Sequence, residues 1–222
     1  MLVEYLMRQI RADEWQADHP QPITFSSDRM IDGQHRLMAI SAAGVTVEAH
    51  VRTGVRDDLR QYIDTGISRA LEDRCCFSED GEINRRVGQL ITSGWFLTNC
   101  RSRPTPLEAK EIFDTNSEGL LFAATWLHRH KIRGVMRAPV MVALAEFYRL
   151  AKDWAEAFVE SLVKPDGEVQ QARILRDYLL RNADTSGHAD AQDKYTKAVS
   201  AMISFAHGKE IKVLRGSNWK AL

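Results

Sequence analysis

The sequence has only three cysteines, and two of them are adjacent: Cys75, Cys76 and Cys100. An odd number of thiols does not suit a disulfide framework and indicates a reducing compartment. Long hydrophobic runs are also missing, because the longest, Val140 to Ala145, ends at Glu146. A membrane-spanning helix needs about 20 apolar residues. We therefore expect a cytoplasmic protein with no membrane partner.

The chain also lacks net charge, since its 30 Lys and Arg residues balance 30 Asp and Glu residues. This balance argues against a strongly basic nucleic-acid binder or an acidic tail over the chain as a whole. The charge is nevertheless divided: the first 80 residues carry a net −5 and the remaining residues a net +5. With 222 residues, 44% of them hydrophobic, the chain is long enough for one large or two small globular domains.

The first third of the chain mixes helix and strand patterns. Helical spacing of apolar residues predicts a helix over residues 1–13, and Gly44 after a second periodic stretch predicts a helix over 34–43. Strands are expected at Ile23–Phe25 and Arg29–Asp32, as a hairpin, and at Val45–Val51. These patterns predict a small mixed sheet packed against two helices.

The rest of the chain is predicted to be helical, after a linker at Ser78–Gly81. Helices are expected at 83–97, 105–116, 118–130, 138–150, 154–163, 169–182 and 191–207. The fold class is therefore α+β, with an N-terminal domain at 1–78 and a helical domain at 79–222. Aromatic residues such as Trp126 and Trp154 would form its core or a homodimer contact equally well.

The segment Asp32-Gly33-Gln34-His35-Arg36 joins a predicted strand to a predicted helix. A helix N-terminus presents unpaired amides and partial positive charge, and His35 and Arg36 would add to an anion cradle there. Gly33 would let a ligand approach the backbone, and Asp32 would hold a metal ion or a hydroxyl. The alternative interpretation is structural: Asp32 caps the helix, Gly33 makes the turn and Arg36 pairs with a carboxylate.

This box and the elements around it resemble the ParB/sulfiredoxin-like superfamily. ParB partition proteins carry Gly-Glu-Arg-Arg at this place and bind CTP, and sulfiredoxins carry Gly-Cys-His-Arg and bind ATP. The likeness covers residues 1–75 and is greatest to ParB-like proteins of phages, plasmids and other mobile elements. It implies a sulfiredoxin-like fold that binds a nucleoside triphosphate, ATP or CTP, with Mg²⁺. Gly33, Gln34, His35 and Arg36 would contact the phosphates.

The box departs from both families at Gln34. This position holds the nucleophilic cysteine of sulfiredoxins, and glutamine cannot act as that nucleophile, so sulfiredoxin activity is not expected. It also holds the glutamate of ParB proteins, so phosphate binding is better supported than hydrolysis. Whether the protein is an enzyme stays open. Hydrolysis or phosphoryl transfer would use Asp32, His35 or Asp64 as catalytic groups.

A second motif follows at Asp64-Thr65-Gly66, with Arg69 and Asp73 downstream. Within a helix, Arg69 and Asp73 would share one face, because four residues separate them. The resemblance suggests that Arg69 contacts phosphate and that Asp73 joins Asp32 as a metal ligand. The simpler interpretation is one exposed ion pair at a helix start.

A basic run in the helical region supports a second functional hypothesis. The run comprises Arg129, Lys131, Arg133 and Arg137. Such a run would bind the DNA backbone, or would form an ordinary solvated helix end. The second hypothesis is therefore a non-enzymatic regulator of a mobile element that binds DNA or a protein. His128 and His130 lie on different sides of a helix and do not form a metal pair.

Overall fold

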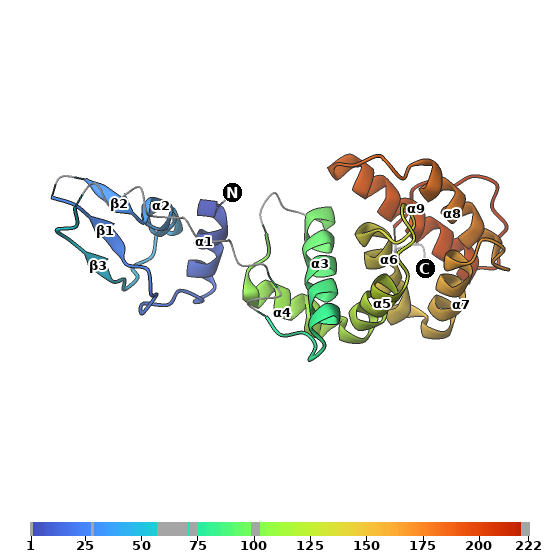
Figure 1. The fold of residues 1–222 in the computed structure, drawn as a ribbon, viewed down its shortest axis with the longest axis horizontal. Coiled ribbons are helices and arrows are strands. Elements are labelled where there is room, and N and C mark those ends of the chain that lie inside the picture. Colours follow the sequence, from blue (N-terminus) through green and yellow to red (C-terminus); the bar gives the residue numbers. More distant parts are fainter. Residues whose placement is uncertain (1, 28, 57–70, 72–74, 99–102, 219–222) are drawn as a thin grey trace. The chain divides into compact units, whose positions relative to one another are not determined.

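The protein divides into two compact units (Figure 1). The first comprises Met1–Ala70 and Arg101–Leu107, and the second comprises Leu71–Cys100 and Glu108–Leu222. The computed structural model describes residues 2–27, 29–56, 71, 75–98 and 103–218. The division falls eight residues before the predicted linker, and a short later segment returns to the first unit.

The first unit contains a three-stranded mixed sheet in the order β2-β1-β3. Strand β1 (Ile23–Phe25) pairs antiparallel with β2 (Met30–Asp32) and parallel with β3 (Val51–Arg52). The expected hairpin is thus confirmed. Helices α1 (Leu2–Arg11) and α2 (Gln34–Ala43) pack against each other, as Figure 1 shows.

The predicted strand over Val45–Val51 is wrong for most of its length. Only Val51 lies in β3, while Val45 to His50 adopt no regular structure. A side chain takes one of the backbone acceptors in this segment, since the indole Nε1 of Trp15 donates to the Glu48 carbonyl at 2.7 Å. The alternating pattern of the segment gave no sign of that contact, because Trp15 lies 33 residues away in the sequence.

The small core of the first unit lies between its two helices. Ile10 of α1 and Ala39 and Ala43 of α2 are buried there. Glu14, just after α1, holds the segment that returns to this unit: its Oε1 accepts hydrogen bonds from the Thr105 hydroxyl at 3.2 Å and the Leu107 amide at 2.8 Å. A helix begins here at Pro106, one residue after its predicted start at 105. The Glu14 carboxylate, which is distant in the sequence, supplies an acceptor for the first turn of this helix.

The described residues of the second unit contain helices and connecting loops but no strand. Its helices, with α4 beginning in the returning segment, are α3 (Gly81–Thr98), α4 (Pro106–Thr115), α5 (Ser117–Arg129), α6 (Ala138–Leu150), α7 (Lys152–Val163), α8 (Gln170–Arg181) and α9 (His188–Ala206). The predicted bounds of α6 are confirmed, and the others differ by at most three residues at either end. The mixed α+β class is therefore correct.

Helix α6 forms the centre of the second unit and packs against α3, α5, α7 and α9. A helix surrounded in this way must be apolar on all sides, and α6 buries eight of its residues. Phe147 of α6 and Phe158 of α7 are fully buried with their ring centroids 6.2 Å apart. Trp154 is 45% exposed, so the predicted core role fits it only in part. No described helix has the length and apolar character needed to cross a membrane.

Candidate functional site

The turn from β2 into α2 depends on Gly33. This residue has φ 98° and ψ 9°, in the left-handed region that glycine adopts readily. A Cβ atom here would also lie 3.0 Å from Cγ2 and 3.2 Å from Cα of Ile23 in the neighbouring strand. Backbone conformation and close strand contact therefore both favour glycine, as the sequence motif suggested.

Arg36 is occupied by partners inside the first unit. Its guanidinium donates to the backbone carbonyls of Gln21 and Pro22 and forms a 3.0 Å ion pair with Oδ2 of Asp32. The side chain is only 13% exposed. In this arrangement Arg36 fastens the start of α2 to the chain that leads into β1, which matches the structural alternative.

Asp32 has both carboxylate oxygens engaged. Its Oδ1 accepts the Gly33 amide at 2.6 Å, and its Oδ2 receives Arg36. The Asp32 carboxylate thus accepts the Gly33 amide of the turn, whereas no side chain caps the amides in the first turn of α2. A metal-binding or catalytic role for Asp32 would therefore have to use the remaining lone pairs of oxygens that already hold the turn.

Gln34 and His35 are the exposed side chains of the box. Within the part of the chain that the structure describes, His35 has no hydrogen-bond partner, and the first turn of α2 contains no acidic residue. The first amides of an α-helix have no acceptor within that helix. The surface thus combines backbone donors, an imidazole and a carboxamide, which together suit an anion.

The second motif cannot be compared with the first. Asp64, Arg69 and Asp73 all lie outside the described residues. Among the residues that are described, no group of three or more His, Cys, Asp and Glu side chains could hold a metal ion. The catalytic role of Asp64, the phosphate contact of Arg69 and the metal-binding role of Asp73 therefore stay predictions.

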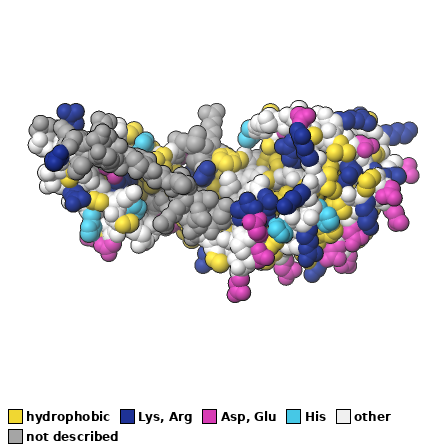
Figure 2. All heavy atoms as spheres, viewed as in Figure 1, with side chains coloured by type: hydrophobic (Ala, Val, Ile, Leu, Met, Phe, Trp, Pro, Cys, Tyr) yellow, Lys and Arg dark blue, Asp and Glu magenta, His cyan; other side chains and the backbone are white. Residues whose placement is uncertain are grey.

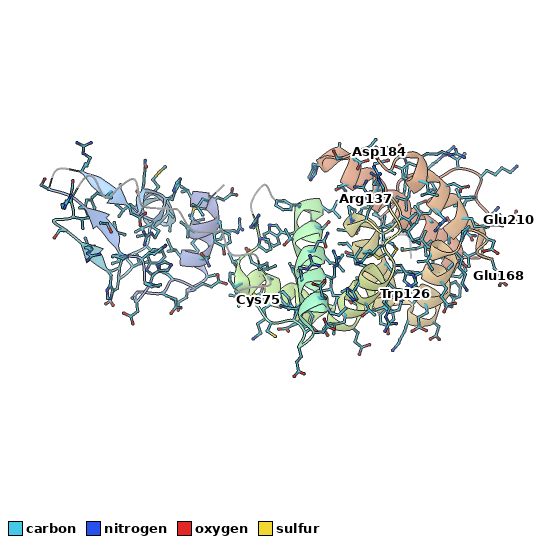
Figure 3. The ribbon with its side chains drawn as sticks, in the orientation of Figure 1. Cys75, Trp126, Arg137, Glu168, Asp184 and Glu210 are labelled. Carbon is cyan, nitrogen blue, oxygen red and sulfur yellow. The ribbon has the colours of Figure 1, made fainter. Side chains whose placement is uncertain are left out.

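Two residues of the basic run bind partners inside the second unit. Arg133 forms a 2.7 Å ion pair with Asp184, and Arg137 donates to the carbonyl of Ala183. Figure 3 shows Arg137 and Asp184 at the same end of the helical unit. Arg129 and Lys131 are exposed. Half of the predicted DNA-binding residues therefore contact the segment between α8 and α9.

The face in Figure 2 does not present one sign of charge. Over the helical unit, basic and acidic side chains are interspersed. The histidines of the basic run make different contacts. The ring of His130 stacks on Trp126 with centroids 4.8 Å apart, while Nδ1 of His128 lies 3.9 Å from Glu82.

Two features of the second unit were missed at the level of sequence. One is the buried ammonium of Lys194, which is 1% exposed and bound to Asp190 and Thr185. The other is a cavity beside α8 and α9. The four-residue spacing of Asp190 and Lys194 was a visible signal of their pairing. The cavity had no local signal, because the C-terminal segment forms one of its walls.

Comparison with family models, with curated proteins and with solved structures finds no match to this chain. The resemblance to the ParB/sulfiredoxin-like superfamily therefore depends on the box and its strand–turn–helix setting.

Proposed function

We propose that the first unit is a ParB/sulfiredoxin-like domain that binds the phosphate chain of a nucleoside triphosphate at the start of α2. The observation that carries the proposal is the exposed beginning of this helix, directly after a strand and a turn in which any residue other than glycine would be strained. Backbone amides and helix polarity attract phosphate at such a position.

The details of the structure change which side chains would hold the phosphates. His35 and Gln34 are exposed and would contact them directly. Arg36 is engaged by Asp32 and two carbonyls, so it would act by positioning the turn. Its guanidinium still contributes positive charge beneath the helix start, although the Asp32 carboxylate offsets much of that charge.

The proposal concerns binding, and it assigns no hydrolytic step. Both oxygens of Asp32 already accept internal hydrogen bonds from the Gly33 amide and Arg36, so the proposal gives this carboxylate a structural role. Mg²⁺ would arrive with the nucleotide, as is usual for an ion that keeps most of its own water ligands.

A thermal-shift panel of ATP, CTP, GTP and ADP with Mg²⁺ tests the proposal. A nucleotide at about 100 times its dissociation constant should stabilise the folded protein by about 2.7 kcal/mol. The His35→Ala variant should lower the shift, and His50→Ala is the matched control, because His50 is an exposed imidazole of the same unit. No shift with any nucleotide, or equal loss in both variants, would contradict the proposal.

A further inference from the structure

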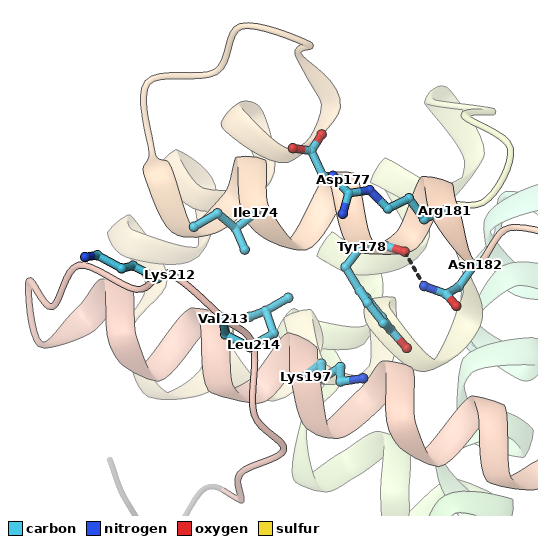
Figure 4. A pocket seen from close by; sticks show the side chains of 9 residues that line it. All are labelled: Ile174, Asp177, Tyr178, Arg181, Asn182, Lys197, Lys212, Val213 and Leu214. Atoms are coloured by element: carbon cyan, nitrogen blue, oxygen red, sulfur yellow. Dashed lines mark hydrogen bonds between the residues drawn. The ribbon is translucent and has the colours of Figure 1, made fainter.

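The second unit contains a cavity of about 530 Å³ between α8, α9 and the C-terminal segment. Figure 4 shows Ile174, Tyr178 and Val213 around the same hollow. Cavities of about 300–1,000 Å³ are the usual size for small-molecule sites. This cavity is therefore large enough for an organic ligand, and it lies in the unit that does not contain the box.

The C-terminal segment forms one wall of the cavity, and hydrogen bonds hold it on both sides of Val213. Before Val213, the side chain of Gln171 donates to the Lys209 carbonyl at 2.5 Å, and the Ile211 amide donates to Gln170 at 3.2 Å. After it, the Ser217 amide donates to the Thr196 carbonyl at 3.1 Å. These bonds to α8 and α9 hold the wall in place, so the hollow is formed before any ligand arrives.

One apolar residue of the lining is open to solvent. Val213 is 70% exposed although the adjacent Leu214 is buried at 8%. Ile174 and the ring of Tyr178 face the same space (Figure 4). Exposed apolar groups that converge in a hollow lose unfavourable contact with water when an apolar ligand covers them.

The charged part of the lining is mainly basic, with Arg181, Lys197 and Lys212 against one acid, Asp177. Lys197 is 22% exposed and its Nζ lies 4.2 Å from the Tyr178 ring centroid. An ammonium has three donors, and one of those on Lys197 goes to Asp193 at 2.8 Å. The other two donors make no described hydrogen bond, and Lys197 is one of the residues that line the cavity.

The ion pair with Asp193 keeps Lys197 in place. Partial burial opposes ionisation of Asp193, but hydrogen bonds from Lys197 and the Tyr178 hydroxyl outweigh it and lower the pKa of this carboxyl. The carboxylate therefore stays ionised at neutral pH and fixes the ammonium beside the ring. Arg181 lies near Asp177 on the rim, where Figure 4 shows it above Tyr178.

We propose that this cavity binds a small organic anion, with its anionic group at Lys197 and Arg181 and its apolar body against Ile174, Tyr178 and Val213. Carboxylates and phosphate monoesters share this chemistry, and both would form charge-assisted hydrogen bonds to the two cations. The site is separate from the proposed nucleotide site, because every lining residue belongs to the second unit.

Ligand-observed NMR titrations of the full chain separate the contributions of charge and of the apolar body. The probes are phenyl phosphate and benzoate, with inorganic phosphate lacking the ring and benzyl alcohol lacking the charge. At least one organic anion should bind about tenfold more tightly than inorganic phosphate and than benzyl alcohol, since each control lacks one set of contacts. The two organic probes distinguish a phosphate monoester from a carboxylate ligand.

Three variants locate the binding. Arg181→Gln should weaken the organic anion about tenfold by loss of a charge-assisted contact. Val213→Ser should weaken it while leaving inorganic phosphate unchanged. Arg173→Gln is the matched control, because Arg173 is an exposed cation of α8 outside the lining and should leave affinity unchanged.

Several results would overturn the proposal. They are absence of binding by both organic anions at millimolar concentration, equal affinity for inorganic phosphate, or equal effects of Arg181→Gln and Arg173→Gln. Circular dichroism of each variant checks the fold, and a variant at Arg181 removes no hydrogen bond that the structure describes. Lys197→Gln serves as a second charge variant and should also weaken the anion about tenfold.

Discussion

Replacing Lys194 by methionine should destabilise the second unit by about 3 kcal/mol. The ammonium of Lys194 is 1% exposed and donates to Asp190 at 2.6 Å and to the carbonyl and hydroxyl oxygens of Thr185 at 3.2 and 3.1 Å. Methionine fills a similar volume but has no donor. Asp190, whose side chain is 18% exposed, would then lose its main partner.

The magnitude follows from the burial of the pair. Removing one partner of a buried ion pair costs about 3–5 kcal/mol, and the residual exposure of Asp190 favours the lower end. Lys197→Met is the matched control, with the same four-residue spacing to an aspartate in the same helix. Lys197 is 22% and Asp193 45% exposed, so that change should cost about 1 kcal/mol or less.

Urea unfolding followed by far-UV circular dichroism measures both variants. With a slope of about 2 kcal/mol/M, the midpoint of the second unit should fall by about 1.5 M in Lys194→Met. The double variant Lys194→Met, Asp190→Leu should recover part of the loss, because it removes the unpaired carboxylate. A loss below about 1 kcal/mol, or one equal to that of Lys197→Met, would refute the reasoning.

Three further predictions concern the glycine turn, Arg36 and the two ion-paired aspartates of α9. Gly33→Ala should destabilise the first unit by about 2 kcal/mol, because alanine would be strained at this φ and would press against Ile23. Gly44→Ala, which has no atom near its Cβ position, should cost about 1 kcal/mol. Thermal unfolding of the two variants compares these costs. Arg36→Ala should cost about 2 kcal/mol and speed amide hydrogen exchange in residues 21–43. Because the folded-state pKa values of Asp190 and Asp193 are lowered, their stabilisation is complete above the unfolded pKa of about 4 and falls as pH drops below it, which acid titration of unfolding measures.

Local patterns predicted the helices well and the edge of the sheet poorly. The apolar residues of α6 lie within that helix and Gly44 directly follows α2, so local sequence was sufficient. Strand β3 depended on where Val51 meets β1, and the contact between Trp15 and Glu48 interrupted the expected alternation. Such contacts between distant residues leave no periodic signal.

The candidate site shows the same division between local and distant information. The glycine turn and the four-residue spacing of Asp32 and Arg36 could be recognised in the sequence. That Arg36 also reaches the carbonyls of Gln21 and Pro22 could not, because those residues lie 15 and 14 positions upstream. The sequence therefore led to a ligand-binding role for Arg36, whereas in the structure this residue holds the start of α2 to the chain before β1.

The most direct test of the central claim is a ¹H–¹⁵N NMR titration of the full chain with Mg²⁺-ATP and Mg²⁺-CTP. The account predicts that one of these nucleotides shifts the backbone amides of Gln34, His35 and Arg36, and that His35→Ala weakens the response. Shifts confined to other parts of the chain, or no shift at millimolar nucleotide, would contradict phosphate binding at the start of α2.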